Sequence, residues 1–424
     1  MPERRDFLKA ASAAFTTQIF TGNLKGANDK HNVAVIGMGR MGRSNLGFAM
    51  KQDNVVVTHV CDVYKPHLDK AVEMTEGKAK GVRDFREILA DKSVDIVCIS
   101  TPDHWHAYMT IEACKASKDV FVEKPISVTI DEGKKMVEAA RKYNRVVQAG
   151  TMQRSGAHFQ KAVDLVKTGV LGQVTMVHTW NYGNTPAEGI GSPADAEPPS
   201  ELDWDMWLGP APKRAFNQNR FGVDPKAFSH FRWFWDYAGG MMTDWGVHWL
   251  DIVQMAFSEA MPTGVACLGG KFRLKDNRET LHVIHAAYEY PGFLCTYENR
   301  TGNGQSMFGK GGGILFYGDK ATLFVDRSGY KIVPERGASV VEEEVKSSNN
   351  MNMAHWQNFI GCVRTRQKPI SDIETCYRST TTCLLANVAL RSRLRLDWDG
   401  ETVRQSEARR FLGREYRKPW KLTV

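Results

Sequence analysis

The chain has 424 residues, which is too long for one ordinary hydrophobic core, so we expect two domains. Hydrophobic residues make up 42% of the sequence and charged residues 25%, the balance of a globular protein. The net charge of +8 is spread along the chain, and no apolar run approaches the roughly 20 residues of a membrane-spanning helix, so we expect neither nucleic-acid binding nor a membrane span.

The first thirty residues predict an export signal or a disordered leader. The pair Arg4-Arg5 is followed by the mildly apolar stretch Ala10–Phe15. This arrangement resembles a twin-arginine signal, which carries folded proteins across the bacterial inner membrane. Such signals usually have Ser or Thr where this chain has Glu3, and an ordinary basic N-terminal helix is the alternative. We therefore expect a periplasmic or otherwise exported protein, with a cytoplasmic one as the alternative.

The next segment predicts a dinucleotide-binding turn. His31–Ile36 is a short, apolar and β-branched run, which is typical of a buried parallel strand. It leads into a G-x-G-x-x-G motif made of Gly37, Met38, Gly39, Arg40, Met41 and Gly42. In such a motif the first glycine allows a tight turn, the second lets the backbone approach a pyrophosphate, and the third lets helix and strand pack closely. The N–H groups at the start of the following helix then face the phosphates.

An acidic residue at the end of the second predicted strand indicates which dinucleotide is bound. The strand Val55–Cys61 ends in Asp62, twenty residues beyond Gly42. A carboxylate at this point accepts hydrogen bonds from ribose hydroxyls and repels a 2′-phosphate. We therefore expect NAD rather than NADP as the cofactor. The alternative role of Asp62 is that of a turn residue.

The alternation of strands and helices continues to residue 150 and predicts a parallel sheet with helices on both faces. Further strands are expected at Val94–Ser100, Asp119–Val122 and Arg145–Gly150, and helices from near Asp103 and over Asp131–Tyr143. Ligands of such sheets lie beyond the carboxyl ends of the strands. Four residues follow two of these ends and are expected beside the nicotinamide ring: Thr101, Pro102, Glu123 and Lys124.

Neither the histidines of this half nor the cysteines of the whole chain indicate a metal site. His104 and His106 are spaced like a metal pair, but no carboxylate or cysteine companions lie in range, so we interpret them as a helix start that borders the cofactor. The eight cysteines occur singly, and Cys61 and Cys98 lie in predicted buried strands. We predict core packing for them, with no disulfide framework and no metal site.

These motifs together resemble the Gfo/Idh/MocA family of oxidoreductases. Glu123-Lys124-Pro125, preceded by Thr101-Pro102-x-x-x-His106 and by the glycine motif, carries the resemblance, which extends from about residue 31 to 395. It implies hydride transfer between a nicotinamide cofactor and a secondary alcohol of a sugar or cyclitol. It also implies a Rossmann domain over residues 31–150 with His106 and Glu123 beside the cofactor.

The second half predicts an α+β domain over residues 151–395, followed by a tail over 396–424. Alternating strands are expected at Val174–Trp180, His282–Tyr290, Phe293–Asn299, Gly313–Tyr317 and Ala321–Val325. They predict an open, largely antiparallel sheet, so the chain as a whole is of the α/β class. The resemblance implies that the outer sheet face joins subunits into a dimer or tetramer. It also implies that the helices after His355, including Thr375–Arg391, return to the domain junction.

The segment Gly239–Val253 carries the candidate catalytic residues. Asp244 and His248 are four residues apart and Asp251 follows three later, so one buried helix would place them on one stripe. Buried ionisable groups are costly unless they are paired or used, and a satisfied hydrogen-bond cluster is the alternative. The catalytic Asp and His of the family match Asp244 and His248. We expect His248 to be the general base, Asp244 to orient it and Lys124 to anchor the substrate oxygen, although Lys124 and His248 could exchange roles.

Further substrate contacts are expected from four residues: Arg154, Arg232, Trp235 and Asp251. Trp235 is one of six tryptophans between residues 204 and 249, and such rings stack on sugar C–H faces. Surface roles are the alternative for both arginines. An exported enzyme would need tightly bound NAD, so the alternative function is a glycosidase or lyase that oxidises its sugar transiently. A non-catalytic NAD sensor is a third hypothesis, which the intact Lys124, Asp244 and His248 argue against.

Overall fold

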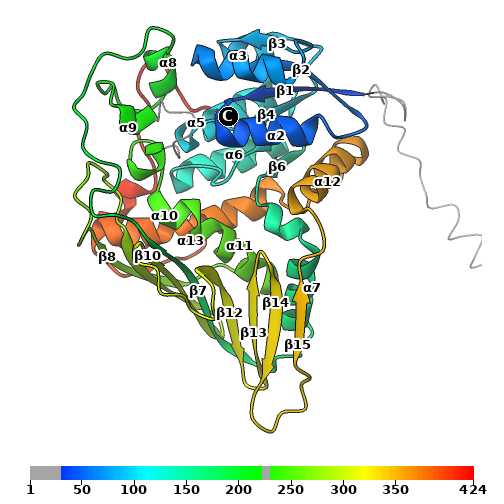
Figure 1. Cartoon of the computed structure of the whole chain (residues 1–424), viewed down its shortest axis with the longest axis vertical. Helices are drawn as coiled ribbons and strands as arrows, with labels where there is room; N and C mark the ends of the chain where they lie inside the picture. Colours follow the sequence, from blue (N-terminus) through cyan, green and yellow to red (C-terminus); the bar gives the residue numbers. More distant parts are fainter. Residues whose placement is uncertain (1–29, 222–229) are drawn as a thin grey trace, which may run out of the picture. The chain divides into compact units, whose positions relative to one another are not determined.

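The computed structural model describes residues 30–221 and 230–424 (Figure 1). The predicted export signal lies outside these residues. Within the described part of the chain, no helix combines the length and the apolar character needed to cross a membrane.

The first half forms the predicted parallel sheet. Its six strands stand in the order β3-β2-β1-β4-β5-β6. They are β1 (His31–Ile36), β2 (Val55–Cys61), β3 (Lys80–Val82), β4 (Ile96–Ile99), β5 (Asp119–Val122) and β6 (Val147–Ala149). The predicted bounds of β1, β2 and β5 are confirmed, whereas β4 and β6 are shorter than predicted and β3 was not predicted. β4 and β5 are buried along their whole length, as apolar strands covered on both faces must be.

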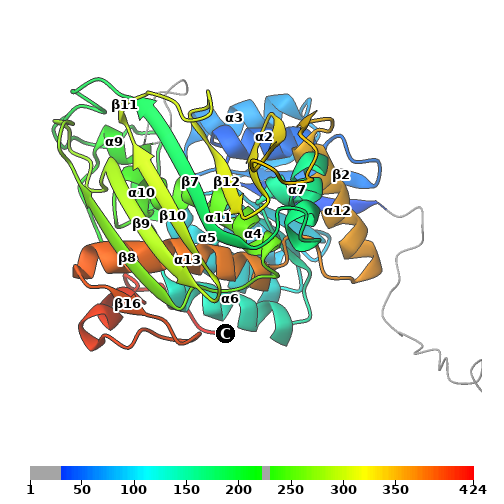
Figure 2. The same ribbon diagram turned by 90° about the horizontal axis from the view of Figure 1, so that it is seen from below.

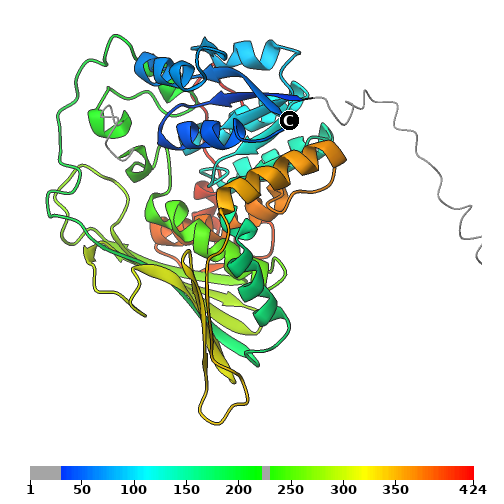
Figure 3. The same cartoon turned by 45° about the vertical axis from the view of Figure 1, so that its right-hand side comes forward.

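Helices cover both faces of this sheet (Figures 1 and 3). They are α2 (Arg40–Ala49), α3 (Lys65–Met74), α4 (Phe85–Ala90), α5 (Asp103–Lys115) and α6 (Ile130–Lys142). At the start of α6, the carboxylate of Glu132 accepts the backbone N–H of Thr129 at 3.0 Å, as in a capping box. The sheet and its helices therefore form the predicted Rossmann domain.

The second half forms an open, largely antiparallel sheet, as predicted. The strand order is β15-β14-β13-β12-β7-β10-β9-β8-β16, with the short β11 on β7, and only β7 and β10 run parallel. The strands are β7 (Val174–Asn184), β8 (Gly264–Gly270), β9 (Val283–Tyr290), β10 (Phe293–Arg300), β11 (Gly302–Asn303), β12 (Gly312–Gly318), β13 (Ala321–Asp326), β14 (Gly329–Pro334), β15 (Glu343–Lys346) and β16 (Leu396–Asp397).

Helices cover one face of the second sheet, and α13 crosses β8 to β10 in Figure 2. The helical segments are η1 (Met152–Ser155), α7 (Ala157–Lys167), α8 (Trp204–Leu208), α9 (Gln218–Phe221), η2 (His230–Trp233), α10 (Gly240–Asp244), α11 (Gly246–Ala256), α12 (Met351–Thr365), α13 (Ile373–Ser392) and η3 (Ser406–Phe411). The uncovered face exposes apolar side chains, among them Met176, Leu268 and Leu294.

The segment predicted as one helix from Gly239 onward is two helices. The helix α10 ends at Asp244 and α11 begins at Gly246. The N–H of His248 bonds the carbonyl of Trp245, three residues back, and Gly246 has low helix propensity. Asp244 and His248 therefore lie in two consecutive helices, where one continuous helix was predicted.

The C-terminal elements return to the Rossmann domain, in agreement with the expectation from the family. The ring of Trp356 on α12 stacks on Phe121 of β5, with centroids 4.7 Å apart. In the last residues, Trp420 packs edge-on against Trp105 and Tyr108 of α5, at 4.9 and 5.1 Å. The C-terminal part of the chain thus packs against β5 and α5 of the Rossmann domain.

Candidate active site

One cavity of about 510 Å³ lies where the carboxyl ends of the parallel strands face the second domain. Predicted site residues on its wall are Gly37, Gly39, Arg40, Met41, Asp62, Thr101, Pro102, His106, Glu123, Lys124, Arg232, Asp244 and His248. Residues from both domains thus meet in one space, as ligand sites at the ends of α/β sheets usually do.

The glycine motif has the form that a dinucleotide requires. Gly37 has a φ of +86°, and a Cβ there would lie 2.7 Å from the backbone N of Thr101. A Cβ on Gly42 would lie 1.7 Å from the carbonyl oxygen of Gly37, so this glycine serves close packing and is not on the cavity wall. At Gly39 a Cβ would meet nothing within 4 Å, and no side chain caps α2. The open space and the free N–H groups fit a pyrophosphate.

Asp62 is a turn residue, and its side chain also lines the cavity. One carboxylate oxygen accepts the N–H of Met38 at 2.6 Å, and the other accepts the N–H of Tyr64 at 2.8 Å. Asp62 thereby fixes the glycine motif to the chain that enters α3. The side chain of Met38 is fully buried in the core and does not line the cavity, so only its backbone belongs to the site.

Lys124 follows β5 and meets Asp244 across the cavity. Its Nζ donates to Asp244 Oδ1 and to the backbone oxygen of Asp244, both at 2.8 Å. Asp244 Oδ2 lies 3.2 Å from Arg232 Nε. Burial alone would raise the pKa of the Asp244 carboxyl, but Arg232 and Lys124 outweigh it and lower the pKa to about 2. The ionised carboxylate therefore holds Lys124 at the cavity wall.

His248 stands on α11, and its imidazole lines the same cavity. Its Nδ1 is buried and has no hydrogen-bond partner among the described residues. Burial, together with the charges of Arg327 and Lys124, holds the pKa of His248 well below its usual value, so the ring is neutral at pH 7. The prediction that Asp244 orients this ring is wrong, because that carboxylate contacts Lys124 and Arg232 instead.

His248 is supported by two residues, Gln153 of η1 and, through Gln153, Arg327, which follows β13. Gln153 Nε2 donates to the backbone oxygen of His248 at 2.8 Å, and Gln153 Oε1 accepts from Arg327 Nε at 2.9 Å. The guanidinium of Arg327 lies over the ring of Trp245, 4.5 Å from its centroid. Neither Gln153 nor Arg327 was predicted as a site residue, since neither belongs to a local sequence motif.

Two buried acids border Lys124. Burial raises the pKa of Asp103 to about 7, although Lys124 and Arg232 oppose this shift. Burial also raises the pKa of Glu123, whose Oε1 accepts from the Asn45 side chain at 2.9 Å. Asp103 was missed as a site residue, although its place directly after Thr101-Pro102 at a strand end was a usable signal.

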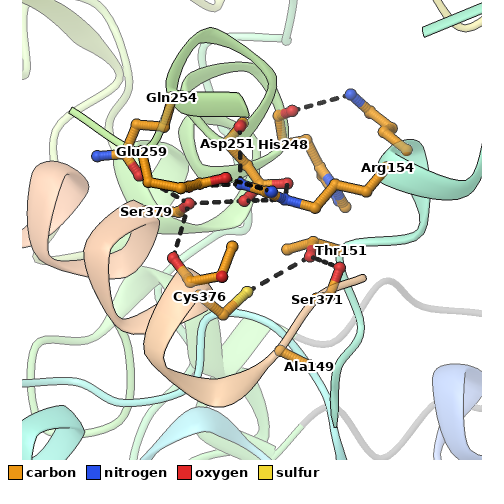
Figure 4. A network of polar contacts seen from close by, with 12 residues as sticks. Ala149, Thr151, Arg154, His248, Asp251, Gln254, Glu259, Ser371, Cys376 and Ser379 are labelled. Atoms are coloured by element: carbon orange, nitrogen blue, oxygen red, sulfur yellow. Dashed lines mark hydrogen bonds and ion pairs between the residues drawn. The ribbon is translucent and has the colours of Figure 1, made fainter. Parts of the chain in front are cut away.

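The predicted substrate residues Arg154 and Asp251 do not line the cavity, because they pair with each other (Figure 4). Arg154 Nε contacts both carboxylate oxygens of Asp251, at 2.9 and 2.8 Å, and its Nη1 and Nη2 bond Glu259 at 2.7 and 3.0 Å. Asp251 also accepts from Ser379 Oγ at 2.6 Å. The carboxylates thus neutralise Arg154, and the predicted substrate contact of this pair is corrected to a structural one.

Trp235 also lies away from the cavity. Its ring is covered by Arg391 at 5.0 Å, so the predicted sugar stacking at Trp235 is not available in this cavity. Trp207 and Trp245 line the wall instead.

The rings of His104 and His106 form hydrogen bonds with backbone carbonyl groups. The ring nitrogens of His106 bond the carbonyl oxygens of Pro125 and Thr101, and His104 Nε2 bonds that of Trp207. No group of three His, Cys, Asp or Glu side chains in residues 30–221 and 230–424 is arranged to hold a metal ion. Cys61 and Cys98 are buried in the core, as predicted, and all eight cysteines are free.

Residues 31–151 match the oxidoreductase family with an NAD-binding Rossmann fold, and residues 157–422 match the C-terminal α/β domain of that oxidoreductase family. The inositol 2-dehydrogenase of Salmonella typhimurium is 31% identical over 150 residues, which cover 35% of this chain and 45% of that enzyme. A glycosyl hydrolase family 109 protein of Shewanella baltica is 28% identical over 202 residues, covering 40% and 44%. The chain thus spans less than half the length of these curated relatives.

Solved structures show the same fold at low sequence identity. The WlbA dehydrogenase of Bordetella pertussis, in complex with NADH and UDP-GlcNAcA, has a TM-score of 0.64 at 19% identity, over 87% of this chain and 99% of that one. The aldose–aldose oxidoreductase of Caulobacter crescentus has a TM-score of 0.66 at 20% identity, over 87% and 100%.

Proposed function

Because the chain belongs to the Gfo/Idh/MocA family of oxidoreductases, we propose that it exchanges a hydride between NAD and a secondary alcohol of a sugar or cyclitol. One observation carries this proposal: the glycine motif, the Lys124–Asp244 pair and His248 line a single cavity. The inositol dehydrogenase relative supports the class of substrate.

The residues at the strand ends fit the cofactor. The backbone of Gly37–Gly42 and the start of α2 would hold its pyrophosphate, and Asp62 would bind the ribose hydroxyls. Thr101 and Glu123 would border the nicotinamide ring, which supplies the redox chemistry when bound. The chain itself has to bind the alcohol, orient it and accept its proton.

Lys124 and His248 would divide the work on the hydroxyl group. Lys124, held in place by Asp244, would donate a hydrogen bond to the hydroxyl oxygen. The neutral imidazole of His248 would take the hydroxyl proton as hydride leaves the carbinol carbon. The alternative is the exchange of these two roles. Asp244 acts in either case as the positioning residue of Lys124.

The proposal is tested by incubating the purified protein with NAD and a panel of sugars and cyclitols while NADH formation is followed. We expect turnover with at least one member of the panel. A protein that binds neither NAD nor NADH in titrations would contradict the proposal, whatever the panel shows.

Asp62 provides a separate test of cofactor choice. We expect Asp62→Ala to weaken NAD binding by roughly 10-fold to 100-fold and to narrow the preference for NAD over NADP, since a charged hydrogen-bond acceptor is lost. Asp62→Asn is the control, because it keeps one oxygen for the Met38 N–H while removing the charge that repels a 2′-phosphate. Titrations that show a preference of the wild-type protein for NADP would contradict the role of Asp62.

A glycosidase or lyase that oxidises its sugar transiently is the second candidate. The glycosyl hydrolase family 109 relative favours it. The best-known glycosidases of this kind depart from the Glu-Lys-Pro motif, which this chain keeps as Glu123-Lys124-Pro125. We therefore rank it second.

We further propose that the protein is exported with NAD already bound and that its cycle returns the cofactor unchanged. The Arg4-Arg5 pair supports export in the folded state, and a loosely held cofactor would be lost outside the cytoplasm. Denaturing protein purified from the periplasm is expected to release stoichiometric NAD. Protein found only in the cytoplasm with Met1 retained, or turnover that consumes free NAD stoichiometrically, would rule this out.

We also propose a homo-oligomer that uses the uncovered face of the second sheet. The exposed side chains of Met176 and Leu294, paired on neighbouring strands, support this proposal together with Leu268. Exposed apolar patches of this kind commonly mark protein contacts.

A further inference from the structure

Arg327 is the cavity residue whose position the proposed reaction does not explain. It lies between β13 and β14 and lines the cavity beside His248. Gln153 fixes its Nε, and the ring of Trp245 supports the flat face of the guanidinium. The side chain is therefore held rigidly, and the bond to Gln153 uses only Nε, not Nη1 or Nη2.

This guanidinium has no carboxylate partner in the described part of the chain. Its Nη2 is buried without any hydrogen-bond acceptor among those residues. The neighbouring carboxylate of Asp326 is turned away, accepting from the N–H of Ser328 at 2.8 Å and lying 3.5 Å from Lys310 Nζ. Asp244, whose charge raises the pKa of Arg327, is engaged by Lys124 and Arg232.

Three cations and three acids share this end of the cavity. Lys124, Arg232 and Arg327 lie there with the carboxyl groups of Asp244, Asp103 and Glu123. The oxygens of Glu123 accept from the side chain of Asn45 and from the backbone N–H of Lys124, so they do not pair with Arg327. Burial raises the pKa of Asp103 to about 7, so Asp103 supplies only part of a negative charge at neutral pH. Burial also lowers the pKa of Arg327 to about 10, against the attraction of Asp244, and the guanidinium stays protonated.

A largely buried cation without a carboxylate partner destabilises the fold unless another group or a ligand compensates its charge. Ligand binding is one such compensation. The attraction between an anion in the cavity and the guanidinium offsets the cost of removing the guanidinium from water. Planar guanidinium groups bind carboxylate and phosphate oxygens through parallel hydrogen bonds. A neutral hydroxyl would accept a hydrogen bond but leave the charge uncompensated.

We propose that the substrate is an acidic sugar or polyol, whose anionic oxygen group, a carboxylate or a phosphate ester, is bound by Arg327. This proposal rests on the proposed function, since it names the class of substrate that the same cavity takes. The anion lies at Arg327 beside Trp245, and the reacting hydroxyl lies between Lys124 and His248.

The test compares sugars that differ at one position only. Glucose, glucuronate and glucose 6-phosphate, and the corresponding galactose series, are titrated calorimetrically into the NAD-saturated protein. We expect at least one acidic member to bind about 10-fold to 100-fold more tightly than its neutral counterpart, the effect of a hydrogen bond to a charged group. The carboxylate and phosphate arms distinguish the two sources of the anion.

Variants separate charge from positioning. Arg327→Met is expected to abolish the preference for the acid, and Arg327→Lys to retain part of it. Gln153→Leu removes the support of His248 and the bond to Arg327 Nε but keeps the charge of Arg327, so it should lower kcat and retain part of the preference. Arg300→Met is the matched control, because Arg300 also lies over an aromatic ring, Tyr182 at 4.0 Å, but outside the cavity.

Two results would overturn the proposal. In the first, no acidic member binds more tightly than its neutral partner to the wild-type protein, a result that does not depend on any variant folding. In the second, Arg327→Met weakens NAD binding while the preference for the acid stays unchanged, which would assign Arg327 to the cofactor. Failure of the proposed function is seen separately, as an inability to bind NAD or NADH.

Discussion

Lys124→Ala is expected to lower kcat by about 100-fold or more while the Kd of NAD stays nearly unchanged. The Nζ of Lys124 is held by two oxygens of Asp244 at 2.8 Å, so its position is defined before substrate enters. An alanine removes the donor to the hydroxyl oxygen but leaves the glycine motif untouched. His248→Ala is expected to have a similar effect, because both groups act on the same hydroxyl.

The variant should fold, because Asp244 keeps its ion pair with Arg232 when Lys124 is removed. Lys115→Ala is the matched control, since Lys115 pairs with Glu112 on α5 and does not line the cavity. Stopped-flow or steady-state NADH formation gives kcat, and fluorescence titration gives the Kd of NAD. Wild-type turnover in Lys124→Ala would remove Lys124 from the mechanism.

The residues of the Rossmann half were predictable because the signals are local. A buried parallel strand is a continuous apolar run, and the turn that follows requires glycines at fixed spacing, so β1 and Gly37–Gly42 are readable without knowledge of the rest of the chain. Lys124 was placed correctly on the cavity wall for the same reason, as the residue after a strand end.

Pairings between distant residues were not predictable from the sequence. The i, i+4 spacing of Asp244 and His248 suggests contact only within a continuous helix, but α10 ends at Asp244. The partner of Asp244 is Lys124, which is 120 residues away in sequence. Arg327 lies in a hairpin turn, where arginine is ordinary. Its lack of a carboxylate partner among the described residues is visible only in the folded structure.

Arg154 shows the same limit and leads to the second large effect. The sequence left it open between a substrate contact and a surface role, whereas its side chain is only 3% exposed and lies between two carboxylates (Figure 4). Burial lowers the pKa of Arg154, but Asp251 and Glu259 outweigh it and raise the pKa above the usual value. The three charges therefore form one buried unit that joins η1 to α11.

Arg154→Met is expected to lower the free energy of unfolding by roughly 3–5 kcal/mol, because removing one partner leaves buried charge uncompensated. The side chain of Asp251 is 1% exposed and would keep only Ser379 as a hydrogen-bond donor from this cluster, whereas Glu259, at 28%, can turn toward water. Urea denaturation followed by circular dichroism measures the loss.

Two further variants decide whether the loss comes from stranded charge or from lost packing. Arg154→Met combined with Asp251→Leu removes the stranded carboxylate, so it should recover part of the stability if charge is the cause. Arg214→Met is the matched control, because its ion pair with Asp236 is half exposed on the arginine side and should contribute less than about 1 kcal/mol. If Arg154→Met lowered the free energy of unfolding by no more than the control does, water would have to enter the cluster. Equal losses in the single and double variants would mean that packing of the Arg154 side chain, rather than its charge, joins η1 to α11.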